Sequence, residues 1–177
     1  MPNKRTWIVR TGLALALLAA TGLAPVWAGS GLMPKGGYAT LQGDNAVADL
    51  ASGDTWPAGK AMTYVTVSPD GKRVMATSSG EDRIYAYDAT SGKRLATIPV
   101  GDTPKGIKIG RDGRYAIAVN EGGGTVSVID VAELEVIKTI PVGDTPHNSV
   151  FSPDNRRVYV TLQGEHNVAV IDLKQMA

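Results

Sequence analysis

The sequence predicts an all-β fold, a β-propeller built from blades of four antiparallel strands. Three observations support this prediction. A long stretch returns after 42 residues, the seven residues IPVGDTP occur identically at 98–104 and 140–146, and Asp88, Asp130 and Asp172 are equally spaced. Repeats of about 40–45 residues that each hold four short strands are typical of propeller blades.

The best-preserved repeat shows the four strands separately. Runs rich in β-branched and aromatic residues at 63–68, 73–78, 83–88 and 94–100 predict strands one to four. Turn residues separate them, such as Pro-Asp-Gly at 69–71, where proline presets φ and glycine accepts positive φ. Strands two and three are apolar or small on both faces, which indicates a sheet sandwiched between two others.

The repeats fall at about 33–62, 63–104, 105–146 and 147–177. The first repeat is poorly preserved and lacks strand one, and the last repeat stops where strand four would begin. We therefore expect about three and a half blades, a partial and open propeller. Propellers usually close with 4–8 blades, which leaves three explanations: a fragment of a longer propeller, a half that self-associates, or a compact four-bladed ring.

The first 28 residues have the plan of a secretory signal peptide. Basic residues stand at positions 4, 5 and 10, an apolar run covers 11–24, and Val26-Trp27-Ala28, small or tolerated residues before a cleavage site, is followed by Gly29-Ser30. The alternative is a transmembrane anchor, but spanning needs roughly 20 apolar residues. We expect cleavage after residue 28, a partial propeller over 29–177, a periplasmic or secreted location and no stable membrane anchor.

Composition excludes several functions. Setting aside residues 1–28, which hold three of the 18 basic residues, leaves 15 basic and 17 acidic side chains without a basic cluster. We therefore expect no nucleic-acid partner. The chain has no Cys, which excludes c-type haem attachment, Fe–S ligation and thiol catalysis.

The motifs SPDN, RVYVT and NVAVIDL of the last repeat, with IPVGDTP before it, resemble the YVTN-type β-propeller repeat. The resemblance covers residues 33–177. It implies a seven-bladed ring with a ligand or partner face around the central channel. More distant relatives of this architecture include haem d1 domains, quinone-dependent dehydrogenase subunits and lactonases.

Two residues are candidates for ligand binding. His147 stands at the head of a first strand, which is innermost in a propeller, and could serve as an axial haem ligand or a proton donor. Lys105 occupies the same place one repeat earlier. The resembling repeat often has His at this place in blades without a ligand, so a structural role is the alternative. His166 is expected in a solvated loop.

Other conspicuous residues have structural explanations. The three equally spaced Asp residues lie in different blades and are expected to accept backbone N–H bonds in the following turns. Gly122–Gly124 is not followed by a helix or a Lys-Ser/Thr pair, so it is not a phosphate loop. The strand tyrosines are expected to pack within or between blades. We predict no catalytic residue and no metal site, because one candidate His without Cys supplies too few ligands.

Two functions remain from the sequence. The first is an exported, non-enzymatic binding or scaffold propeller, expected to be a fragment of a longer one, without a cofactor and with an unknown protein or small-molecule partner at its face. The alternative is part of a periplasmic, cofactor-bearing redox or haem-handling propeller. A lactonase-type hydrolase would need converging acidic metal ligands, which the sequence lacks.

Overall fold

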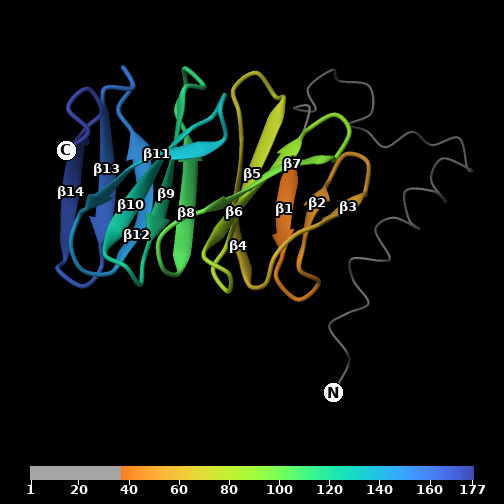
Figure 1. Ribbon diagram of the computed structural model, residues 1–177, viewed down its shortest axis with the longest axis horizontal. Coiled ribbons are helices and arrows are strands. Elements are labelled where there is room, and N and C mark those ends of the chain that lie inside the picture. Colours follow the sequence, from red (N-terminus) through yellow and green to blue (C-terminus); the bar gives the residue numbers. More distant parts are fainter. Residues whose placement is uncertain (1–36) are drawn as a thin grey trace, which may run out of the picture. The chain divides into compact units, whose positions relative to one another are not determined.

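The computed structural model describes residues 37–177 and places 14 strands of that range in four antiparallel sheets (Figure 1). This confirms the all-β prediction. The predicted signal peptide at 1–28 lies outside the described residues. Within 37–177 there is no helix long and apolar enough to cross a membrane.

Each sheet takes its strands from one continuous stretch of chain. The first sheet contains β1 (Tyr38–Leu41), β2 (Ala46–Asp49) and β3 (Thr55–Pro57). The second contains β4 (Met62–Val67), β5 (Arg73–Ser78), β6 (Arg83–Asp88) and β7 (Arg94–Pro99). The third contains β8 (Pro104–Ile109), β9 (Tyr115–Asn120), β10 (Thr125–Asp130) and β11 (Glu135–Pro141). The fourth contains β12 (Pro146–Phe151), β13 (Arg157–Leu162) and β14 (Asn167–Asp172).

The predicted strands agree closely with the observed ones. Strands two and three of the best repeat coincide with β5 and β6, whereas β4 is displaced by one residue and β7 ends one residue early. Pro99 and Pro141 end the outer strands β7 and β11. Proline has no N–H to donate, so a place on the sheet edge leaves no ladder bond unmade.

The turns use their aspartates as the sequence predicts. Asp88 Oδ1 accepts the backbone N–H groups of Thr90 and Ser91 at 3.0 and 2.8 Å. Asp130 and Asp172 do the same in the third and fourth sheets. These bonds satisfy turn backbone that no strand pairs, so the three carboxylates are structural.

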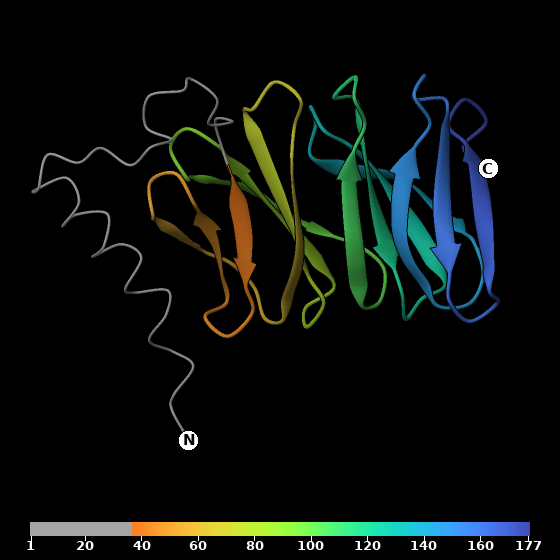
Figure 2. The ribbon, with the colours of Figure 1, turned by 180° about the vertical axis from the view of Figure 1, so that it is seen from behind.

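The sheets follow one another in chain order, and Figure 2 shows their inner strands side by side. Strand β4 contacts both β1 and β8, and β8 contacts β12. An apolar cluster fills each space between neighbouring sheets. Trp56 of the first sheet packs on Tyr38 and Tyr87, with ring centroids 5.3 and 5.4 Å apart.

Burial of both faces holds for the second and third sheets but not for the fourth. Val126 and Val128 of β10 are fully buried. Their counterparts in β14, Val168 and Val170, are 49% and 56% exposed. The same alternation of small and apolar residues therefore has a different environment in the fourth sheet.

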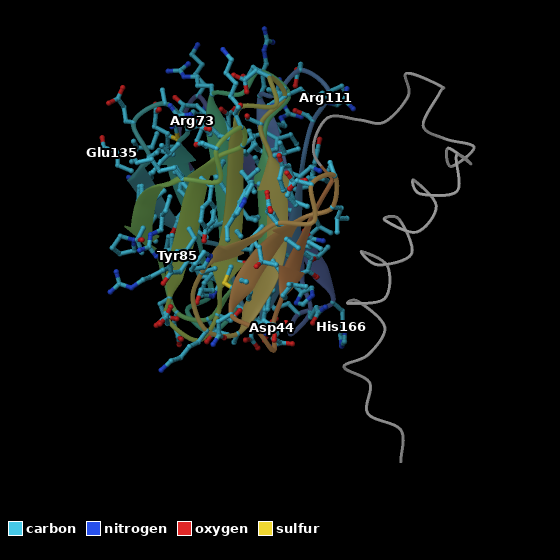
Figure 3. All side chains as sticks on the ribbon, turned by 90° about the vertical axis from the view of Figure 1, so that its right-hand side faces the viewer. Asp44, Arg73, Tyr85, Arg111, Glu135 and His166 are labelled. Carbon is cyan, nitrogen blue, oxygen red and sulfur yellow. The ribbon has the colours of Figure 1, made fainter. Side chains whose placement is uncertain are left out.

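The blades have two ends, which we call rim 1 and rim 2. Rim 1 carries the turns after the inner strands, at 69–71, 111–113 and 153–155, and rim 2 carries the turns between strands two and three. In Figure 3, Arg73 and Arg111 lie at rim 1, and Asp44 and His166 lie at rim 2.

Candidate functional site

The two predicted ligand-binding residues meet at rim 2 through a third side chain. Lys105 is in β8 and His147 is in β12, at equivalent places of neighbouring inner strands. Glu121, in the turn after β9, lies between them. Its Oε2 is 2.7 Å from His147 Nδ1, and its Oε1 is 3.9 Å from Lys105 Nζ. The structure thus joins residues 42 positions apart into one polar group.

Tyr64 of β4 closes the group from the far side. Its hydroxyl lies 3.3 Å from His147 Nε2, and the two rings are 6.1 Å apart in an edge-on arrangement. The contact joins the second sheet to the fourth across the inner strand of the third. Gly106 of β8 permits the close approach, because a Cβ there would come within 2.8 Å of the His147 carbonyl oxygen.

The hydrogen bonds define what the imidazole can do. A carboxylate only accepts, so His147 Nδ1 donates its proton to Glu121. In the neutral ring the lone pair is then on Nε2, where the Tyr64 hydroxyl donates to it. The side chains of Lys105, Glu121 and His147 are 26%, 25% and 30% exposed. Solvent and a ligand can therefore reach the group.

This arrangement fits a histidine that would ligate the iron of a haem-type cofactor through Nε2. A ligating His usually donates its other N–H to a carboxylate, which sets the tautomer and ring orientation and raises the basicity of the ligand. A haem iron needs few protein ligands because its macrocycle supplies the others. A bare metal ion needs more, and residues 37–177 contain no group of three His, Cys, Asp or Glu side chains able to hold one.

Neighbouring blades are also joined at this place one repeat earlier, but through different partners. Ser79 corresponds to Glu121, and Thr63 corresponds to Lys105. The Ser79 hydroxyl donates to the carbonyl of Pro104 and lies 3.1 Å from the Thr63 hydroxyl. In both places the residue after strand two bonds the start of the next inner strand, through a backbone carbonyl in one case and through charged side chains in the other.

Sequence reasoning found His147 and Lys105 but missed Glu121 and Tyr64. Comparison of positions 79, 121 and 163 would have marked Glu121, since they hold Ser, Glu and Gln. No local pattern marks Tyr64, which lies 83 residues from its partner.

The other candidates have the roles that the sequence suggested. His166 is exposed in the turn between β13 and β14, with a φ of 54°. Gly122 packs against Asp102, where a Cβ would come within 2.6 Å of the carboxylate. The close approach of Asp102 requires a glycine at position 122, so phosphate binding is not needed to explain this glycine.

The sequence model of the Cytochrome D1 heme domain family matches residues 59–177. The chain belongs to this family. No curated protein in the comparison matches the chain.

Solved structures share the fold, among them the following three. Hydrazine synthase of Kuenenia stuttgartiensis is 30% identical with a TM-score of 0.61, and the match covers 63% of this chain and 32% of that one. The structures titled U3-55K and RRP9 WD40 repeats are each 17% identical with a TM-score of 0.61. Each match covers 66% of this chain, and 37% and 36% of the other. This cytochrome D1 heme domain family member is thus a partial β-propeller that spans about a third of the length of the structures it matches.

Proposed function

We propose that this chain is part of a haem-handling propeller in which His147 is an axial ligand of a haem-type cofactor. The observation that carries the proposal is the 2.7 Å bond between His147 Nδ1 and Glu121 in a chain of this family. That bond directs the Nε2 lone pair away from the carboxylate. The family match favours this function over the non-enzymatic scaffold that the sequence suggested first.

Each residue of the group has a defined part in binding. Glu121 holds the ring tautomer and orientation, and Tyr64 must release Nε2, a small loss for a bond of 3.3 Å. Lys105, whose Nζ lies 3.9 Å from Glu121 Oε1, would offer its ammonium group to a carboxylate of the cofactor. When bound, the haem supplies the redox and small-ligand chemistry of its iron, tuned by axial ligand and second-shell hydrogen bonds.

A haem titration tests the assignment. Purified protein is titrated with ferric protoporphyrin IX and followed by the Soret band. We expect saturable binding with a red-shifted band, lost in His147→Gly and restored when free imidazole is added. His166→Asn is the matched control, because it removes the other His and Asn tolerates positive φ. Equal binding and an unchanged spectrum in His147→Gly would refute the proposal.

A second variant tests the orienting role of Glu121. Glu121→Gln removes the charge that strengthens the Nδ1 bond but keeps the size of the side chain. We expect the bound iron to show a changed visible spectrum and a higher reduction potential, because a weaker second-shell acceptor makes the imidazole a poorer donor. A spectrum and potential identical to those of the unaltered protein would show that Glu121 acts only in packing.

Export and the repeat type belong to the same proposal. We propose that residues 1–28 direct the chain to the periplasm and that residues 29–177 carry repeats of the YVTN type. The basic start and the apolar run at 11–24 support export. N-terminal sequencing of the periplasmic protein should begin at Gly29, and a form that retains Trp7 would contradict cleavage.

A further inference from the structure

Each sheet has a forward face toward the next sheet along the chain and a backward face toward the previous one. The forward faces of the second and third sheets include, at equivalent positions, Met75, Ile84 and Ala86, and Ile117, Val126 and Val128, all fully buried. The corresponding residues of the fourth sheet are Tyr159, Val168 and Val170, which are 36%, 49% and 56% exposed. The forward face of the fourth sheet therefore has the apolar residues of a face that another sheet covers.

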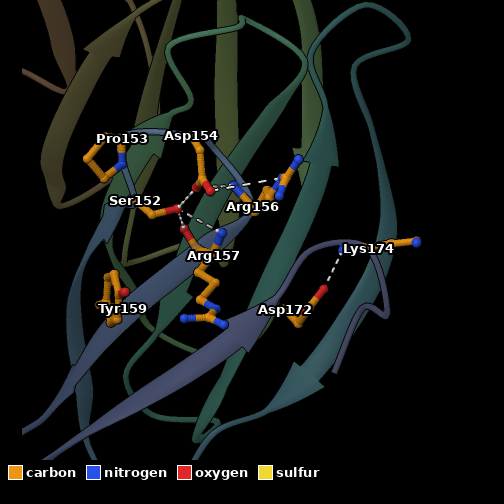
Figure 4. A pocket seen from close by; sticks show the side chains of 8 residues that line it. All are labelled: Ser152, Pro153, Asp154, Arg156, Arg157, Tyr159, Asp172 and Lys174. Atoms are coloured by element: carbon orange, nitrogen blue, oxygen red, sulfur yellow. Dashed lines mark hydrogen bonds and ion pairs between the residues drawn. The ribbon is translucent and has the colours of Figure 1, made fainter.

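The hollow at rim 1 between the second and third sheets shows which residues cover a forward face. Between the second and third sheets it measures about 320 Å³, with Arg73 on one wall and Val131 and Ala132 on the other. On the fourth sheet the equivalent hollow measures about 790 Å³, and its lining includes Arg157, Tyr159 and Asp172 of that sheet alone (Figure 4). The missing wall corresponds to the backward face of another blade.

The backward face of the first sheet has the residues of such a wall. Its Leu50 donates its backbone N–H to the carbonyl of Gly37 at 2.8 Å. Val131 and Leu173 make the same bond in their own sheets, to Arg114 and Arg156, so the three positions are equivalent. Val131 and Leu173 are 4% and 6% exposed and pack between sheets, whereas Leu50 is 65% exposed. The two ends of the array thus expose complementary halves of one interface.

The polar groups at rim 1 complement each other as well. The Arg73 guanidinium donates to the carbonyl of Ala132 on the following blade at 3.3 Å. Arg157 holds the position of Arg73, and Ala51 holds that of Ala132. Residues 37–59 contain three Asp and no Lys or Arg, so this sheet attracts the arginine.

We propose that two copies of this chain pair head to tail, with the forward face of the fourth sheet of one copy covering the backward face of the first sheet of the other. Leu50 enters the large hollow, and Arg157 bonds the carbonyl of Ala51. A twofold axis repeats the contact, so that both exposed faces of residues 37–177 are covered in each copy.

Analytical ultracentrifugation of the full chain tests the pairing. We expect a dimer at micromolar concentration, and monomers for Val170→Asp and Leu50→Asp. Ile137→Asp is the matched control: Ile137 is 42% exposed on the outer strand β11, away from both faces, and should leave the dimer intact. Circular dichroism melting verifies that each variant folds.

Mixing the variants separates this arrangement from others. Val170→Asp copies keep a sound backward face and Leu50→Asp copies keep a sound forward face, so an equimolar mixture should recover a heterodimer through one contact. Since the chain has no Cys, Leu50→Cys copies and Arg157→Cys copies should cross-link with each other far more than with themselves. A monomeric unaltered chain, or a dimer that Val170→Asp dissociates but Leu50→Asp does not, would overturn the proposal.

Discussion

The exchange of Val126 for alanine, compared with the same exchange at Val168, measures what a neighbouring blade contributes to stability. The two valines stand 42 residues apart at one position of the repeat, but Val126 is fully buried and Val168 is 49% exposed. Two buried methylene equivalents are worth about 1.6 kcal/mol, and the cavity left behind adds to this, so Val126→Ala should cost about 2–3 kcal/mol. Val168→Ala, half as buried and open to solvent, should cost about 0.8 kcal/mol or less.

Urea unfolding followed by far-UV circular dichroism gives both values. The protein is diluted until sedimentation shows a monomer, so that pairing does not cover Val168. The denaturant dependence of the unfolding free energy should be the same in both variants, since neither changes the surface exposed on unfolding by much. Equal losses at the two positions would show that the repeat position, and not the neighbouring sheet, determines the contribution, and would refute the reasoning.

Two further predictions concern the turns at rim 1. Gly92 and Gly71 both have positive φ, at 67° and 70°, but a Cβ at Gly92 would collide with the indole of Trp56 whereas one at Gly71 meets nothing within 4 Å. Gly92→Ala should therefore destabilise by about 2–4 kcal/mol and Gly71→Ala by about 1 kcal/mol in thermal melts, and similar losses would contradict the packing argument. The backbone N–H of Ser91, followed by its hydroxyl, lowers the pKa of Asp88. The stabilisation is then complete above about pH 4 and is lost as the pH falls through the lower folded-state pKa. The unfolding free energy of Asp88→Asn should fall less between neutral and acid pH than that of the unaltered protein, and an identical decline would exclude this role.

The sheets could be predicted from the sequence because their determinants are local. The runs of β-branched and small residues in β4 and β5, with the turn residues at 69–71 between them, specify strand, turn and strand without reference to distant parts of the chain. The same holds for Asp88, whose hydrogen-bond partners are two and three residues away.

The candidate site and the exposed face could not be predicted in this way. Glu121 meets His147 because two inner strands lie side by side at rim 2, which depends on the packing angle between blades. Val126 and Val168 are the same residue in the same pattern, and only a neighbouring sheet makes one buried and the other exposed. The sequence pattern predicts burial for both valines, but the packing of a neighbouring sheet determines whether each one is buried.

Strands pair only with their neighbours in the sequence, and this affects how the protein folds. Every ladder of β1 to β14 joins strands that are consecutive in the sequence. Local pairings close short loops and form quickly, so each blade can assemble before the next one exists. The slower step is the docking of one finished sheet on another, which buries clusters such as that around Ile117. Folding can then begin at any blade and spread outward in both directions, as in other repeat arrays. A mutation inside one sheet should slow the folding of that blade alone. A mutation in the contact between two sheets should slow the docking of neighbouring blades.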